Sequence, residues 1–200
     1  MTTYCRIKNE KEGTLIVISA PSGTGKTTIC KEILRKIGNL EYSISYTTRL
    51  PRKDEKDGRE YFFVDEKTFK KMIDNKKFVE WANVHQNYYG TSKDFLNKAL
   101  KNGKNVILEI DVQGGEKIKE IYPYSCMVFI APPSFKTLKE RLIARNKDSA
   151  KTIKLRLKNA KDELKYLPKY DYLVINENLN DAVSNVKNII LSQSCKIRKK

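Results

Sequence analysis

The strongest constraint on the fold of this chain is a run of apolar, mostly β-branched residues that is followed directly by glycines and a lysine. Residues 15–18 are Leu, Ile, Val and Ile, and "SAPSGTGKTT" follows at residues 19–28. A short apolar run is typical of a buried strand, and apolar residues recur at helical spacing through residues 25–37. The sequence therefore predicts a strand, a glycine-rich turn and a helix, in that order.

This arrangement is the context of a phosphate-binding loop. Backbone N–H groups of the turn and of the helix N-terminus converge on one anion, and glycines let the backbone approach it closely. The Lys26 side chain would reach the β- and γ-phosphates, and the Thr27 hydroxyl would be a ligand of Mg²⁺. We assign donor-nucleotide binding to Ala20, Pro21, Ser22, Gly23, Thr24, Gly25, Lys26, Thr27 and Thr28.

The loop departs from the strict pattern at one position. The pattern G-x-x-x-x-G-K-[S/T] begins with glycine, whereas this chain has Ala20 there. An ordinary glycine-rich turn is the alternative interpretation. The strand before the loop and the helix after it favour binding of a nucleoside triphosphate.

Apolar runs alternate with helical patterns along most of the chain. Further strands are predicted at residues 105–111, 126–131 and 171–176, and helices at residues 117–121, 134–146, 152–167 and 181–191. This alternation predicts right-handed crossovers and a mostly parallel sheet flanked by helices, the α/β P-loop NTPase fold. Residues 45–98 are aromatic and charged and predict an inserted subdomain of short strands. Residues 145–151 are polar and without periodicity, which predicts a mobile flap.

Composition narrows the class of protein. A chain of 200 residues suits one well-buried domain. It has no apolar run long enough to span a membrane and no signal-peptide pattern at its N-terminus, so we expect a cytoplasmic protein. The four cysteines form no C-x-x-C pair, which indicates free thiols and no zinc site.

The net charge of +16 admits two interpretations. One is a nucleic-acid binder, and the other is an enzyme of phosphorylated small molecules. The charges are spread along the chain, with only a short "KIRKK" cluster at its end. Spread charge is typical of a solvated surface, so we expect no dedicated nucleic-acid binding.

Six motifs in a fixed order resemble one known family. "SAPSGTGKTT", "SISYTTRLPR", "GREYFFV", "FVEWANVHQNYYGTS", "ILEIDVQGG" and "FIAPPS" resemble those of the guanylate kinases, which phosphorylate GMP with ATP in purine nucleotide metabolism and GMP recycling. An alanine at the position of Ala20 is usual there. The resemblance implies a domain at residues 13–192, with a core at about 13–44, 99–138 and 168–192, a GMP-binding insertion at about 45–98, a lid at about 139–167, and tails at 1–12 and 193–200.

The resemblance also implies where GMP binds. Its 5′-phosphate would be held by Arg49, Arg52, Tyr61 and Tyr89. Guanidinium groups suit this role because they bind phosphate through paired hydrogen bonds. Without the surrounding motifs, two arginines in a polar loop would indicate simple solvent exposure.

The guanine base would be recognised by Glu80, with Ser45 and Thr91 at its O6 atom. A carboxylate accepts from both guanine donors, N1–H and the 2-amino group. Adenine would leave that carboxylate desolvated and unpaired, which costs about 1–3 kcal/mol or more. This pattern favours GMP over other nucleoside monophosphates, which remain an alternative.

Two acidic residues end the predicted strand at 105–111. Asp111 would contact Mg²⁺ through water and position GMP, so the predicted metal site comprises Thr27 and Asp111. Glu109 lies two residues earlier on the same face, and a carboxylate satisfied at the strand end is at least as good an interpretation of it.

Catalysis would need positioned cations rather than a covalent intermediate, because phosphoryl transfer has a loose, charged transition state. The resemblance implies this role for Lys26, Arg49, Arg141, Arg145 and Arg156. The family's usual Arg-Gly at the start of the flap is replaced here by Arg145 and an asparagine. The adenine of ATP would pack near Arg145 and Asn176.

Guanylate-kinase-like domains also occur as scaffolding modules without catalysis. Such a module should have lost the loop lysine or the acceptor-site arginines, and this chain keeps them. We therefore expect an enzyme with ATP and GMP as substrates, use of dGMP being left open, and Mg²⁺ as cofactor. We expect no membrane or dedicated nucleic-acid partner, and a monomer or homodimer.

Overall fold

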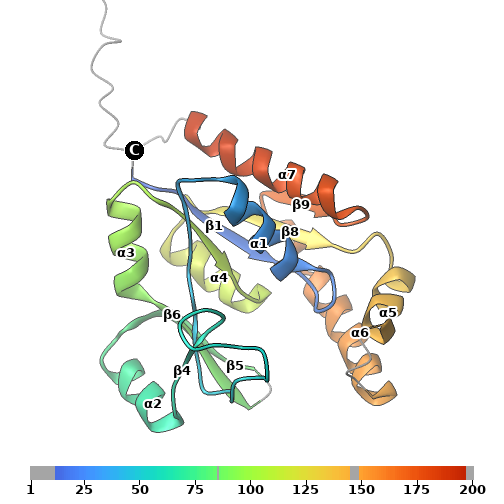
Figure 1. The fold of residues 1–200 in the computed structure, drawn as a ribbon, viewed down its shortest axis with the longest axis horizontal. Helices are drawn as coiled ribbons and strands as arrows, with labels where there is room; N and C mark the ends of the chain where they lie inside the picture. The colour runs from blue at the N-terminus through green and yellow to red at the C-terminus, as the bar shows by residue number, and fades with distance from the viewer. Residues whose placement is uncertain (1–11, 85, 145–148, 197–200) are drawn as a thin grey trace, which may run out of the picture.

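The central element is a five-stranded parallel sheet with strand order β2-β7-β1-β8-β9. Figure 1 labels β1, β8 and β9 of this sheet. The computed structural model describes residues 12–84, 86–144 and 149–196. The predicted parallel sheet is confirmed, with β2 as an additional short edge strand. The strands are β1 (Leu15–Ser19), β2 (Leu40–Tyr42), β7 (Asn105–Glu109), β8 (Cys126–Ala131) and β9 (Tyr172–Ile175).

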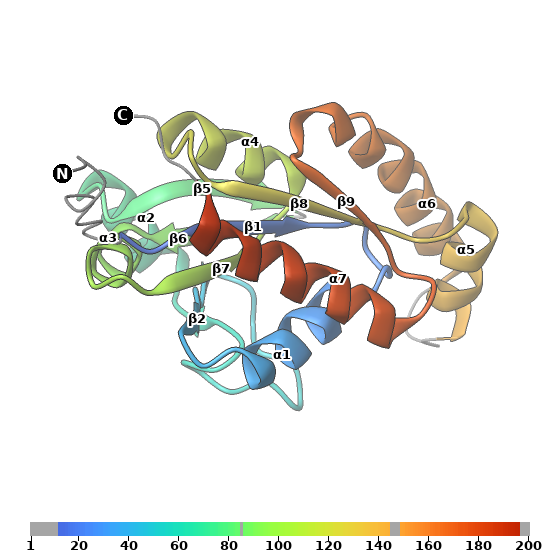
Figure 2. The same cartoon turned by 90° about the horizontal axis from the view of Figure 1, so that it is seen from above.

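Helices cover both faces of this sheet, so its strands are apolar on both sides. Along β1, Ile16 and Ile18 pack into the core under α1 and α7, while Leu15 and Val17 pack into the opposite core with residues of α3 and α4. Figure 2 shows α1 and α7 on one side of the sheet and α4 and α6 on the other. These helices are α1 (Lys26–Lys36), α3 (Lys93–Lys101), α4 (Val112–Ile121), α6 (Ala150–Leu164) and α7 (Leu179–Ser192).

The predicted insertion forms a second, mixed sheet with strand order β4-β3-β6-β5. Its core is aromatic: the rings of Phe69 and Phe78 stack with centroids 4.5 Å apart. Helix α3 spans the predicted boundary at residue 98, yet its Leu96 packs into the main core, which favours a boundary before Lys93. The elements are β3 (Tyr46–Thr47), β4 (Phe62–Phe63), α2 (Glu66–Asp74), β5 (Phe78–Val84) and β6 (Asn87–Ser92).

The predicted lid is a pair of helices, α5 (Phe135–Ala144) and α6, packed through Leu138, Leu142 and Ala160. Ser134 caps α5 as its sequence suggests, since its hydroxyl oxygen accepts from the Thr137 N–H at 3.0 Å. Short 3₁₀ turns follow α6 (Leu167–Lys169) and α7 (Gln193–Cys195).

Several predicted helix boundaries are wrong for identifiable reasons. Helix α4 begins at Val112 rather than at residue 117, because the Asp111 carboxylate accepts from the Gly114 N–H and caps the helix. Helix α6 ends at Leu164, and a 3₁₀ turn containing a proline follows it. That helix already begins at Ala150, inside the predicted flap, because Ser149 caps it; residues 145–148 lie outside the described residues.

The cysteines that can be placed are free thiols, as predicted: Cys30 and Cys126 are buried and Cys195 is exposed. Cys5 lies outside the described residues. Within the described ranges, no helix combines the length and apolar character needed to cross a membrane.

Candidate active site

The phosphate-binding loop and the second sheet face a common cleft of about 400 Å³. It opens at the carboxyl ends of β1 and β7, where ligands of α/β proteins collect. Its lining includes these polar and loop residues: Ala20, Pro21, Ser22, Gly23, Gly25, Lys26, Thr27, Thr28, Ser45, Tyr61, Glu80, Tyr89, Glu109, Asp111 and Glu163. The fold thus brings the predicted donor loop and much of the predicted acceptor site together.

The loop backbone has the conformation that only glycine adopts readily. Gly23 and Gly25 have φ angles of 96° and 97°, and Gly25 is the N-cap of α1. Behind the loop, the buried Asn176 amide donates to the Thr24 carbonyl oxygen at 2.6 Å. Neither Asn176 nor Thr24 lines the cleft, so the Asn176 side chain supports the loop backbone from the buried side.

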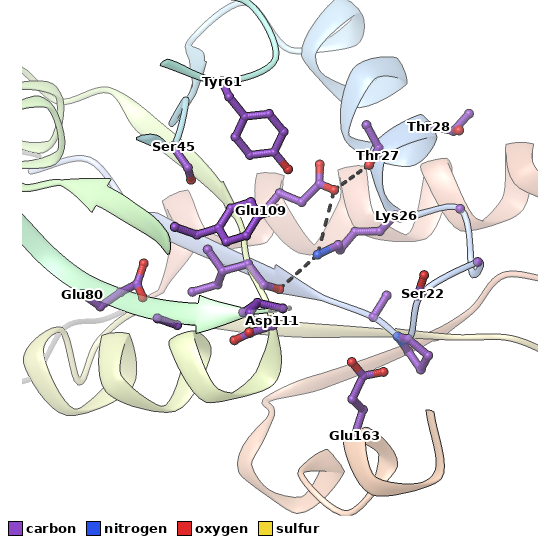
Figure 3. Close-up of a pocket in the computed structure, with 18 of the residues that line it drawn as sticks. Ser22, Lys26, Thr27, Thr28, Ser45, Tyr61, Glu80, Glu109, Asp111 and Glu163 are labelled. Carbon is purple, nitrogen blue, oxygen red and sulfur yellow. Dashed lines mark hydrogen bonds and ion pairs between the residues drawn. The ribbon is translucent and has the colours of Figure 1, made fainter. Parts of the chain in front are cut away.

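Glu109 lies at the centre of the donor end of the cleft (Figure 3). Its Oε1 atom accepts from the Thr27 hydroxyl at 2.6 Å and is 3.9 Å from the Lys26 ammonium nitrogen. Its Oε2 atom accepts from the Tyr42 hydroxyl at 2.9 Å. The Lys26 ammonium also donates to the Ile110 carbonyl at 3.1 Å. The strand-end carboxylate is therefore satisfied, and its partners are the loop residues expected to act on phosphate.

Asp111 lines the cleft just after β7, and its predicted water-mediated contact with Mg²⁺ stays a prediction. Its Oδ1 atom accepts from the Gly114 N–H at 2.7 Å, which directs the carboxylate to the start of α4. The acid hydrogen-bonded to Thr27 is Glu109. Among the described residues, no three acidic, histidine or cysteine side chains group as a metal centre. The Thr27 hydroxyl and the Glu109 carboxylate still form a pair of oxygen donors, the ligand type that Mg²⁺ prefers.

Glu80 and Asp111 meet at the base of the cleft. A Cβ atom at Gly114 would lie 3.3 Å from Glu80 Oε2 and 3.4 Å from Asp111 Oδ1. Burial raises the pKa of the Glu80 carboxyl, and the charge of Asp111 adds to this rise. The Thr91 hydroxyl opposes it by donating to Glu80 Oε1 at 2.6 Å. Thr91 is fully buried, so its contact in the structure is with Glu80.

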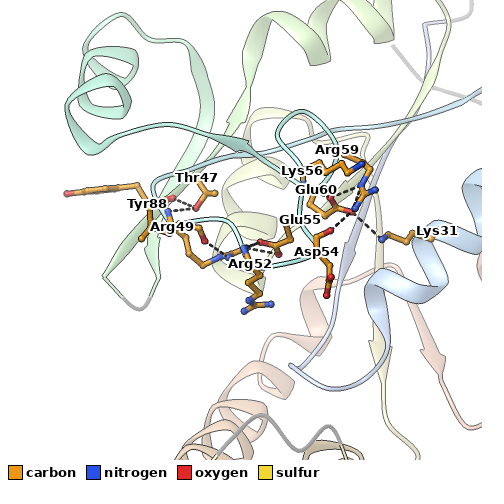
Figure 4. A network of polar contacts seen from close by, with 11 residues as sticks. Lys31, Thr47, Arg49, Arg52, Asp54, Glu55, Lys56, Arg59, Glu60 and Tyr88 are labelled. Carbon is orange, nitrogen blue, oxygen red and sulfur yellow. Dashed lines mark hydrogen bonds and ion pairs between the residues drawn. The ribbon is translucent and has the colours of Figure 1, made fainter.

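The two predicted phosphate-binding arginines lie in a hollow that adjoins the cleft and shares Tyr61 and Tyr89 with it. The Arg49 guanidinium donates through Nη2 to both oxygens of Glu55, each at 2.9 Å, and lies over the Tyr61 ring at 5.4 Å. The Arg52 backbone N–H donates to Glu55 at 2.8 Å. Figure 4 shows this loop as a network of alternating charges.

Comparison with known proteins agrees with this geometry. The guanylate kinase family model matches residues 12–193. The chain belongs to the guanylate kinase family. It is 47% identical to the guanylate kinase of Caldanaerobacter subterraneus over 94% of this chain and 91% of that protein. It is 43% identical to the guanylate kinase of Thermotoga maritima over 93% and 90% of the two chains.

A solved structure gives the same result for the fold. The crystal structure of guanylate kinase from Anaplasma phagocytophilum superimposes with a TM-score of 0.78 at 32% sequence identity. The likeness covers 93% of this chain and 88% of that one. The P-loop NTPase architecture predicted from the sequence is confirmed.

In this guanylate kinase family member, two of the three predicted lid arginines can be placed. Arg156 of α6 donates through Nη1 to the Ser22 hydroxyl oxygen at 3.2 Å, so it lies beside the phosphate-binding loop. Arg141 of α5 donates through Nη2 to the Glu177 carbonyl at 3.4 Å, next to the turn that contains Asn176. Arg145 lies outside the described residues.

The sequence motifs do not indicate three residues that the structure places at the site: Tyr42, Glu55 and Glu163. Burial raises the pKa of Glu163 to about 7, with the Lys26 charge opposing the rise and Asp111 adding to it. Its Oε2 atom is buried without a hydrogen-bond partner among the described residues. The helical spacing could have indicated that Glu163 is buried, since it follows the buried Ala160 by three residues and shares its helix face.

Proposed function

We propose that this chain transfers the γ-phosphoryl group of ATP to GMP, giving ADP and GDP, in purine nucleotide metabolism. One observation carries the proposal: Lys26 at the start of α1 and the buried acid Glu80 of β5 line the same cleft. Membership of the guanylate kinase family supports it.

Glu80 is the proposed reader of guanine. Its carboxylate would accept from N1–H and the 2-amino group, and adenine offers neither donor in that arrangement. Thr91 already donates its single hydroxyl proton to Glu80, so it would hold the acid in place. Ser45 lines the cleft, and its hydroxyl would then donate to the guanine O6 atom. Asp111 would position GMP from the base of the cleft.

The 5′-phosphate of GMP is proposed to bind where the cleft meets the adjoining hollow. Tyr61 and Tyr89 line both spaces, and Arg49 and Arg52 line the hollow. Guanidinium and phenol donors match the oxygen atoms of a phosphate dianion. The acceptor phosphate would therefore lie on the same side of the cleft as Thr27, which also borders both spaces.

Mg²⁺ is the proposed cofactor, and the Thr27 hydroxyl and Glu109 are the residues that would hold it, directly or through water. The ion, when bound with ATP, neutralises charge on the transferred phosphoryl group. The chain's own contribution is to position the two nucleotides and to supply cations. Lys26, Arg49 and the lid residues Arg141, Arg145 and Arg156 are proposed for that role. Closure of the lid would exclude water that otherwise hydrolyses ATP.

A coupled assay of ADP formation tests this proposal. ATP is supplied with GMP, dGMP, AMP, UMP or dTMP in separate reactions. We expect rapid turnover with GMP and background turnover with AMP, UMP and dTMP, and the dGMP reaction defines the use of the deoxy acceptor. Equal turnover with AMP, or none with GMP, would contradict the assignment of the acceptor.

A further inference from the structure

We infer that Tyr42 is a positioning residue that fixes the Glu109 carboxylate for its contact with Thr27 and the Mg²⁺–ATP complex. The inference rests on the proposed kinase function. It concerns a side chain outside the phosphate-binding loop and outside the motifs that mark the acceptor site. Its basis is a hydrogen bond between neighbouring strands of the main sheet.

The sheet register brings the two side chains together. Tyr42 of β2 pairs with Ile107 of β7, and Glu109 lies two residues further along β7. Residues two apart on a strand point to the same face, so Tyr42 and Glu109 both face α1. The phenol hydroxyl donates to Glu109 Oε2 at 2.9 Å. The other carboxylate oxygen accepts from Thr27, and the carboxylate is thereby held at both ends.

Tyr42 is well suited to fix a neighbour. Its ring packs against the core cluster under α1 and α7, which restricts its two side-chain torsions. Its hydroxyl donates to Glu109 Oε2, and a carboxylate can only accept, so the direction of this hydrogen bond is fixed. Glutamate has an additional rotatable bond and gains a defined orientation from such a partner.

Loss of the Tyr42 hydroxyl would change the end of the cleft that is proposed to bind ATP. Glu109 Oε2 would lose the hydroxyl that donates to it, in a largely buried place where only 12% of the Glu109 side chain is exposed. The carboxylate could then rotate toward the Lys26 ammonium, now 3.9 Å away, and compete with phosphate for it. The Tyr42 hydroxyl therefore keeps both Thr27 and Lys26 available to the nucleotide.

The position of Tyr42 also joins the two halves of the site. The chain leaves β2 after Tyr42 and enters the second sheet at Tyr46, with the cleft residue Ser45 between them. The Ser43 N–H donates to the Ile107 carbonyl at 2.9 Å, which keeps this exit against β7. Tyr42 thus fixes the Glu109 carboxylate at the ATP end of the cleft, and the chain continues from Tyr42 into the proposed GMP-binding insertion.

The test is Tyr42→Phe, which removes the hydroxyl and keeps the ring. Calorimetry measures binding of ATP with excess Mg²⁺ and binding of ATP with EDTA, for the wild type and the variant. Partners behind a metal ligand typically change metal affinity by about 10- to 100-fold, so we expect the preference for Mg²⁺–ATP over free ATP to fall about tenfold. Affinity for metal-free ATP and the KM for GMP should change less than about twofold.

Tyr122→Phe is the matched control, because its hydroxyl donates to Asn97 at 3.0 Å and its ring packs into the opposite core. It should leave the metal preference unchanged. A second comparison adds Tyr42→Phe to Glu109→Gln: if Tyr42 acts through Glu109, the second change should have no further effect on metal preference. This cycle also separates positioning from a general loss of stability.

The outcomes are distinct from those of the proposed function. An unchanged Mg²⁺ preference in Tyr42→Phe, or an equal loss in Tyr122→Phe, would overturn the role of Tyr42 even in an active GMP kinase. A wild type that fails to phosphorylate GMP would overturn the proposed function. In that case the calorimetric comparison still decides whether Tyr42 supports metal–nucleotide binding.

Discussion

Both carboxylate oxygens of Glu55 lie 2.9 Å from Nη2 of Arg49, so an arginine proposed to bind the GMP phosphate is already held within its own loop. The pair is shielded, with 18% of the Arg49 side chain and 14% of the Glu55 side chain exposed. Glu55 also accepts from the Arg52 backbone N–H. One acidic residue therefore orders the loop that carries both arginines before any substrate binds.

Glu55→Gln should raise the KM for GMP about three- to tenfold and change kcat less. The neutral amide would weaken the contact with Arg49, so the loop would have to be ordered when GMP binds. Steady-state kinetics with varied GMP would measure this. Glu60→Gln is the control, since Glu60 pairs with Arg59, whose side chain is 56% exposed. Equal effects of the two changes would mean that Glu55 has no special role in ordering the site.

Glu80→Gln should lower kcat/KM for GMP by about 10²-fold, because the amide NH₂ would oppose the guanine donors instead of accepting from them. ATP affinity should be unchanged. Thr91→Ser keeps the hydroxyl that donates to Glu80 and should have a small effect, whereas Thr91→Val should raise the KM for GMP. Kinetics and ATP calorimetry distinguish these results. If Glu80→Gln retained full preference for GMP over AMP, guanine recognition would have to lie elsewhere.

Lys26→Met should lower kcat by about 10²- to 10³-fold, the usual loss when a group that stabilises transition-state charge is removed. The fold should persist, because the ammonium contributes one hydrogen bond to the Ile110 carbonyl and is partly exposed. Lys36→Met, at the exposed end of the same helix, is the control and should keep full activity. Thermal unfolding of both variants checks the fold. A Lys26→Met enzyme with near-normal kcat would remove the phosphate-binding role of the loop lysine.

Glu163→Gln should flatten the dependence of stability on pH. Burial raises the pKa of Glu163 from 4.5 to about 7, so the folded chain binds this proton more tightly than the unfolded chain. The stabilisation of the folded state by this proton is complete below pH 4.5 and is lost as the pH rises through about 7. Above pH 7 the variant should be more stable than the wild type, by about 1–2 kcal/mol after allowance for solvent screening.

Urea unfolding at pH 5, 6, 7 and 8 measures this difference. The two free energies of unfolding should diverge as pH rises, because only the wild type must ionise a buried carboxyl. Glu140→Gln on the exposed surface of α5 is the control and should follow the wild type. Parallel curves for Glu163→Gln and the wild type would show that Glu163 is solvated in solution.

Local sequence signals predicted elements whose cause is local. The apolar run before the loop became β1, and Gly23 and Gly25 adopt the positive φ angles that favour glycine. Ser134 caps α5 as expected. The start of α4 was missed because the glycines at 114 and 115 disfavour a helix in isolation. Tertiary packing overrides that preference, since a Cβ atom at Gly115 would come within 2.8 Å of the Tyr170 hydroxyl.

The phosphate-binding loop could be identified from residues adjacent in the chain because its anion site is built from consecutive backbone N–H groups. The different contacts of the two acids Glu109 and Asp111, at the end of β7 and just after it, could not be identified in this way. Glu109 faces α1 and meets Thr27, whereas the chain turns after Ile110 and Asp111 caps α4. The Tyr42–Glu109 hydrogen bond likewise depends on the pairing of β2 with β7, strands far apart in sequence. Side-chain contacts of this kind follow from strand register and helix placement, which are set by packing of the whole domain rather than by any local segment.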